Sequence, residues 1–87
     1  MTQGKIELYQ RVALTRDLPA HNLCKGDVAV VVEYLPGTSA SGGEDGYALE
    51  VFNAVGETIA VIIVPVSAVK PLTENEIFQV RPLSVIE

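Results

Sequence analysis

The eleven residues from 25 to 35 read KGDVAVVVEYL, and this stretch decides the fold. Lys25-Gly26-Asp27 predicts a tight turn, and Val28–Leu35 predicts a strand that ends at the Pro-Gly pair of residues 36–37. Side chains on both faces are largely apolar at the start of this strand, which is typical of a strand covered on both sides.

Outward from this strand, turn signals divide the chain at short and fairly regular intervals. Glycine, proline and asparagine mark the breaks, and β-branched residues (thirteen valines, six isoleucines and five threonines) dominate the segments between them. The further strands that this pattern predicts are residues 9–15, 47–53, 57–64 and 69–72, with a single 3₁₀ turn at 65–68. The polar, glycine-rich residues 38–46 predict a mobile hairpin loop.

These segments predict an all-β protein, a small closed or half-closed five-stranded SH3-like barrel with a 3₁₀ turn before the last strand. Closing the sheet would remove the edges that invite aggregation. The expected organisation is one domain over residues 1–87, with a core at about 6–72 and a C-terminal tail at 73–87. Thr73 and Glu76 have capping-box spacing at the start of that tail.

The charge balance limits the partners. Six Lys and Arg against eleven Asp and Glu give a net charge of −5, and the cations form no basic stripe. Because nucleic-acid binding needs clustered cations, nucleic acid and anionic membranes are not expected partners. The longest apolar run, residues 59–66, is far shorter than the ~20 residues that span a bilayer. Cys24 stands alone and residues 1–10 contain no signal-like apolar segment, so a cytoplasmic protein is expected.

No set of residues predicts an enzyme or a cofactor site. His21 lies in a turn-rich loop, where a solvated side chain is favoured over an acid or base. Cys24 lies three residues away, but that spacing fixes no geometry on a loop, so a bystander thiol is favoured. One His and one Cys are too few for a zinc site, and Glu44-Asp45 lacks the calcium-loop pattern. We therefore expect no catalytic residue, cofactor or metal.

The apolar residues exceed what the interior of one small barrel holds, and the surplus lies in residues 59–64 and in the tail. Ile59, Val61 and Ile63 are expected to fill the core, which leaves the alternate residues of that strand to be covered. Either the tail or a second subunit would cover them, and the sequence leaves both open. If their strands are adjacent, Glu33, Glu50 and Glu57 line one outer surface, which is either an acidic docking patch for a basic partner or a solvated face. The candidate interaction surface is Glu33, Glu50, Glu57, Ala60, Ile62, Val64, Ile77, Phe78, Val80 and Leu83.

The order and spacing of several short motifs resemble those of a small bacterial family, domain of unknown function 4926. The residues that carry the resemblance are Leu18-Pro19, Leu23, Lys25-Gly26-Asp27, residues 30–33 and 49–52, Gly56, residues 58–60 and residues 69–72. The resemblance covers roughly residues 9–83, and it implies an SH3-like barrel with no established biochemical activity. Ala29 stands where ribosomal SH3-like modules usually have a glycine, and residues 38–46 make a longer loop than the family usually has. The alanine weakens an inference of RNA binding.

Together these observations predict a non-catalytic protein-interaction module that binds another protein or a second copy of itself. Two versions stay open, an accessory subunit of a larger complex and a neutralising subunit of the antitoxin type. The alternative is a nucleic-acid or ribosome-associated SH3-like module, which rests on fold analogy alone.

Overall fold

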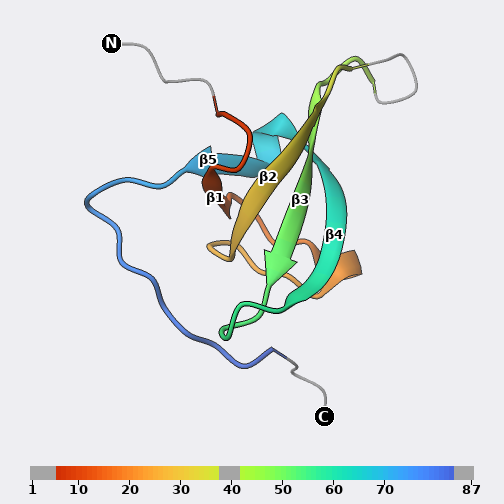
Figure 1. Ribbon diagram of the computed structural model, residues 1–87. Helices are drawn as coiled ribbons and strands as arrows, with labels where there is room; N and C mark the ends of the chain where they lie inside the picture. The colour runs from red at the N-terminus through yellow and green to blue at the C-terminus, as the bar shows by residue number, and fades with distance from the viewer. Residues whose placement is uncertain (1–5, 38–41, 84–87) are drawn as a thin grey trace.

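The computed structural model describes residues 6–37 and 42–83, and it shows an all-β protein. Its five strands are β1 (Arg11–Leu14), β2 (Val28–Leu35), β3 (Gly46–Phe52), β4 (Thr58–Pro65) and β5 (Val69–Pro71). They form one antiparallel sheet in the order β4-β3-β2-β1-β5 (Figure 1). Two 3₁₀ turns complete the described elements, η1 (Pro19–His21) before β2 and η3 (Val66–Ala68) before β5.

The turns form where the sequence predicts them. Gly26 and Gly56 have φ angles of +93° and +91°, which side chains other than glycine rarely adopt. The predicted strands and the predicted 3₁₀ turn are all present, with ends displaced by a few residues. The predicted mobile loop lies partly outside the described residues, because 38–41 are among those left out.

Of the two predicted forms, closed and half-closed, the closed barrel does not form, because the strand pairing leaves the sheet open. Within residues 6–37 and 42–83, β4 pairs only with β3 and β5 pairs only with β1. The sheet curls strongly around its core, yet β5 has just three residues and η3 links it directly to β4 (Figure 1). With three residues, β5 can form only a few backbone hydrogen bonds. These are too few to close the sheet against the eight residues of β4.

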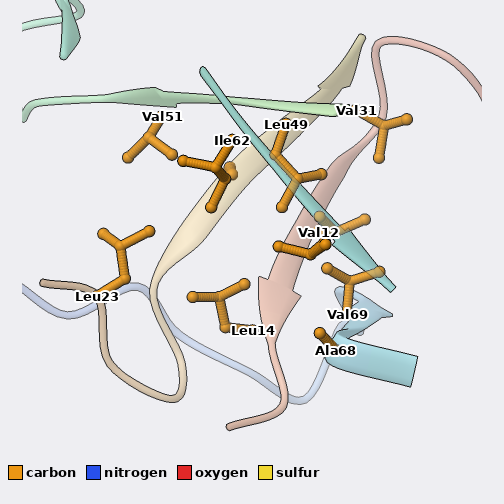
Figure 2. Close-up of a cluster of buried hydrophobic side chains, with 11 residues drawn as sticks. Val12, Leu14, Leu23, Val31, Leu49, Val51, Ile62, Ala68 and Val69 are labelled. Carbon is orange, nitrogen blue, oxygen red and sulfur yellow. The ribbon is translucent and has the colours of Figure 1, made fainter. Parts of the chain in front are cut away.

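Aliphatic side chains from every strand fill the concave face of the sheet (Figure 2). Leu14, Leu49, Val12 and Val31 are the largest side chains with almost no exposed surface. No polar or charged side chain in the described part of the chain is buried. The core therefore depends on apolar burial rather than on a polar network.

The predicted orientation of β4 is wrong. Ile62 and Val64 lie in the core with 5% and 3% of their surface exposed, whereas Val61 and Ile63 are 61% and 68% exposed. The cause is the register with β3, because Ile62 is paired with the buried Leu49. Directly paired residues point to the same face, so Ile62 faces inward and its neighbours face outward.

A bulge in β2 changes its side-chain alternation. The register with β3 shifts between Val31 and Glu33, so that Val31 is opposite Leu49 while Glu33 is opposite Ala48. Val31 remains in the core and Glu33 turns to solvent. A bulge of this kind re-aims the side chains that follow it.

Candidate functional site

The convex face of the sheet, hereafter the outer face, gathers the apolar residues that the core does not take. On β4 it carries Ile59, Val61 and Ile63, all exposed and none charged. Strand pairing places Glu50 of β3 beside Val61, and it places Ala48 of β3 beside Ile63. Contiguous exposed apolar side chains with a charged border are typical of an interaction surface.

Two of the three predicted glutamates share this face. Glu33 is across from Ala48, which is across from Ile63, so Glu33 and Ile63 lie in one row over three strands. Glu50 lies in the next row, and its Oε2 accepts a hydrogen bond of 2.5 Å from the Thr58 hydroxyl. Glu57 stands at the hairpin end of β4, where its Oε1 accepts a 2.8 Å bond from the Asn53 side-chain amide.

The apolar members of the predicted surface divide into two groups. Ile62 and Val64 lie in the core and Ala60 is half-buried against it, so none of these three offers a free surface. The tail residues, by contrast, are exposed: Ile77 by 91%, Phe78 by 63%, Val80 by 86% and Leu83 by 57%. The outward residues of β4 were missed because both of its faces are apolar, and the apolar pattern alone does not say which one faces the core.

The described part of the tail, residues 73–83, contacts β5, β1 and the turn before β2. Its backbone leaves β5, swings away from the sheet and then runs below it in the view of Figure 1. Glu76 pairs with Lys70 of β5, and the ring of Phe78 lies 5.8 Å from the guanidinium carbon of Arg11 on β1. The predicted capping contact is also present, since the Thr73 N–H donates to Glu76 Oε1 at 2.8 Å. These contacts hold the described part of the tail, residues 73–83, at the β5 and β1 end of the sheet.

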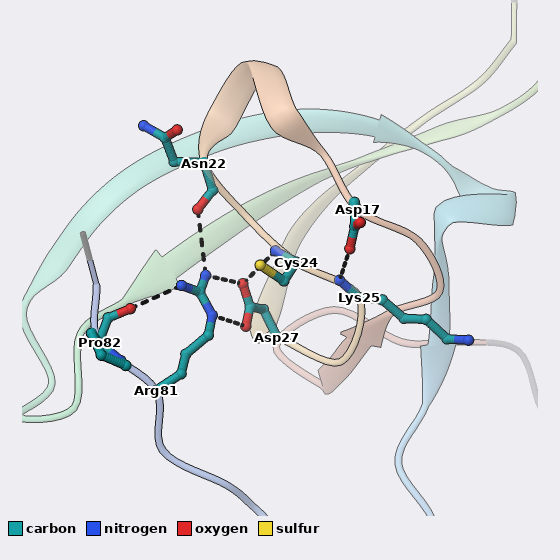
Figure 3. A network of polar contacts seen from close by, with 7 residues as sticks. All are labelled: Asp17, Asn22, Cys24, Lys25, Asp27, Arg81 and Pro82. Carbon is teal, nitrogen blue, oxygen red and sulfur yellow. Dashed lines mark hydrogen bonds and ion pairs between the residues drawn. The ribbon is translucent and has the colours of Figure 1, made fainter. Parts of the chain in front are cut away.

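The strongest tail contact is a two-point ion pair between Arg81 and Asp27 (Figure 3). Arg81 donates from Nε to Asp27 Oδ1 at 2.9 Å and from Nη2 to Oδ2 at 2.5 Å, and Oδ2 also accepts the Cys24 N–H at 2.7 Å. Burial, the largest single influence, raises the pKa of Asp27. The hydrogen bonds from Arg81 and Cys24 and the charge of Arg81 together outweigh it, so this pKa lies below its ordinary value.

A shallow groove of about 410 Å³ lies where the β2–β3 hairpin meets the end of β4. Asp45 within it accepts hydrogen bonds from the Tyr34 hydroxyl and, at 2.7 Å, from the Gly37 N–H. These two bonds lower the pKa of Asp45, the Tyr34 bond more strongly. The carboxylate thus already serves to hold the hairpin. The lining residues are Leu35, Pro36, Glu44, Asp45, Gly46, Ile63, Val64 and Pro65.

His21 and Cys24 both lie on the segment between β1 and β2. Both are exposed, and in the part of the chain that the structure describes no hydrogen bond joins them. Among those same residues no cluster of three or more His, Cys, Asp or Glu has the geometry to hold a metal ion. The described segments also include no helix with the length and hydropathy to cross a membrane.

Fold and surface define the class, a small all-β protein with an open five-stranded sheet and one exposed apolar strand at its edge. The chain belongs to the family described as Domain of unknown function (DUF4926), whose model matches residues 8–71. This match confirms the resemblance seen in the sequence. No curated protein and no solved structure matches the chain.

Proposed function

We propose that this protein is a non-catalytic protein-interaction module whose binding surface is the outer face at β4. The observation that carries the proposal is the exposure of Ile59, Val61 and Ile63 on one uncharged strand. Exposing an apolar row to water costs free energy. An apolar row bordered by carboxylates therefore supports a partner that covers it.

The charges beside this row favour a basic partner. Glu33 and Glu50 lie in the same rows as Ile63 and Val61. The cation of the described strands that shares the row of Glu50 is Arg11 of β1, which lies two strands away across Val30. The outward cations Arg11 and Lys70 are already contacted by the tail residues Phe78 and Glu76. Complementary charge would steer a basic, partly apolar protein to this face. The accessory-subunit and neutralising-subunit versions both need such a surface.

The same proposal includes two finer statements. The strand order and the 3₁₀ turn before β5 support an SH3-like barrel that is left open between β4 and β5. The free thiol of Cys24 and the overall acidic charge support action in the cytoplasm. Neither feature supports an enzyme.

Charge reversal on the outer face tests the proposal. The tagged protein should capture a basic partner from a lysate of its source organism, and Glu33→Lys should lose that partner. Glu74→Lys, in the tail, is the matched control, because each change raises the net charge from −5 to −3 and both side chains are exposed. Equal capture by the two variants would reject the outer face. Strong, salt-sensitive retention on heparin would favour the nucleic-acid alternative.

A further inference from the structure

The two edges of the sheet differ in how they are protected. The β5 edge has three residues and includes Lys70 and Pro71, and both residue types block the addition of another strand. The β4 edge has eight residues and carries no charge, and its one proline, Pro65, is the last residue. A long, uncharged edge strand is a template for pairing with another strand.

The free backbone groups of β4 can be located from its pairing with β3. The Val66 N–H donates to the Asp45 carbonyl at 2.9 Å, and antiparallel ladders alternate between residues that bond their neighbour and residues that do not. Ala60, Ile62 and Val64 therefore point their N–H and C=O groups toward β3, and Val61 and Ile63 point theirs to the open edge. The register shifts between Val51 and Phe52, and Ile59 is the extra residue of β4 at that bulge. Pro65 lies on the open side in this alternation. Because proline has no N–H, it loses no hydrogen bond to β3 at that position.

Val61 and Ile63 also expose their side chains, at 61% and 68%, and Ile59 at the bulge is 39% exposed. Nothing in the described residues covers them, because the tail is held at the other end of the sheet by its contacts to Lys70, Arg11 and Asp27. No backbone bond within residues 6–37 and 42–83 joins Ile59, Val61 or Ile63 to a segment other than β3. Free backbone groups and exposed β-branched side chains thus coincide at Val61 and Ile63.

We propose that β4 pairs antiparallel with β4 of a second copy of this chain, about a twofold axis at Val61. In this register Val61 is opposite Val61 of the second copy, and Ile59 is opposite Ile63 of the second copy. Val61 then forms a hydrogen-bonded pair with Val61 of the second copy, which gives about two bonds at the axis. Because paired residues share a face, the two apolar rows join into one stripe across the axis.

The charge distribution favours a second copy over an unrelated strand. The whole chain carries −5, yet the paired segment Thr58–Pro65 carries none. The twofold register places Glu57 opposite Pro65 of the second copy, so that like charges stay at opposite ends of the seam. An isologous contact needs such a self-complementary patch. Added salt screens the remaining repulsion and strengthens the association.

This inference goes beyond the proposed function, because it rests on the backbone edge of β4 and not on the glutamates of the outer face. Glu33→Lys tests the partner without touching the edge, and the variants below test the edge. The failure of one proposal is therefore distinguishable from the failure of the other.

Sedimentation velocity between 10 μM and 1 mM tests the association. The wild-type protein should form dimers over this range, and Val61→Lys should raise the dissociation constant at least tenfold, since it places two cations face to face on the axis. Ile77→Lys is the control, because it adds the same charge to the most exposed apolar side chain of the tail. A wild-type monomer at 1 mM, or dissociation by Ile77→Lys instead, would overturn the inference.

Cysteine cross-linking tests the register. In a Cys24→Ser background, Val61→Cys should form a disulfide dimer under mild oxidation, because paired Cα atoms lie about 5.5 Å apart, within the disulfide range. Ile63→Cys should not, since the register separates its two copies by about 13 Å along the strands. Circular dichroism of both variants verifies folding. Faster cross-linking of Ile63→Cys, or none in either variant, would overturn the twofold register.

Discussion

Ile62 and Ile63 are adjacent, chemically identical and on the same strand, yet they differ more than tenfold in exposure, at 5% and 68%. Replacing each in turn by alanine therefore isolates the effect of burial. Ile62→Ala removes three buried carbons, which is about 2.4 kcal/mol of transfer free energy at about 0.8 kcal/mol per methylene. The cavity left beside Leu49 adds to this, for a total loss of about 3–4 kcal/mol in the free energy of unfolding.

Ile63→Ala should cost far less. With about two thirds of its side chain in water, the same change loses about one third of the transfer term, or under about 1 kcal/mol. The difference of about 2–3 kcal/mol corresponds to a separation in Tm of about 10 °C or more for a domain of this size. Thermal and urea unfolding should be measured at a concentration where sedimentation shows a monomer, so that pairing at β4 does not contribute. Equal losses, or a larger loss for Ile63→Ala, would refute the assignment of faces.

Three further predictions concern the tail and the β3–β4 hairpin. Arg81→Ala should release the tail to protease while changing the free energy of unfolding by less than about 1 kcal/mol, because the ion pair is partly exposed. The folded protein lowers the pKa of Asp27, so tail docking should be complete at neutral pH and lost as the pH falls through that lowered value; tail amide NMR signals should follow this change, and Asp27→Asn should abolish it. In the hairpin, Gly56→Ala should cost about 1 kcal/mol or more through its φ of +91°, measured as a fall in Tm, whereas an unchanged Tm would contradict a left-handed turn there.

Much of the strand pattern could be predicted because its signals are local. Gly26 and Gly56 supply the turns, Val28–Leu35 is a valine-rich run, and residues 47–53 alternate, with Leu49 and Val51 on the buried face. Each of these signals depends on backbone conformations or side-chain contrasts within a few residues.

The candidate surface was harder to predict, because it depends on pairing between strands. Glu33 and Glu50 were expected to share a face if their strands were adjacent, and the sheet order meets that condition. The apolar half was assigned to the wrong side of β4, since Ile62 and Ile63 look alike in a strand with no polar residue to break the symmetry. The course of the tail depends on contacts to Asp27 and Arg11, which lie more than fifty residues away in the chain.

The sequence by itself determined the all-β class, the five strands, the 3₁₀ turn before β5 and the family, because turn chemistry and β-branched runs act over short distances. Only the tertiary structure decided which face of β4 is buried, where the tail lies and that the sheet stays open. Those outcomes depend on the register of β4 against β3 and on the shortness of β5. A shift of one residue in that register would exchange the core and the surface of the strand, and no local preference in an all-apolar strand opposes such a shift.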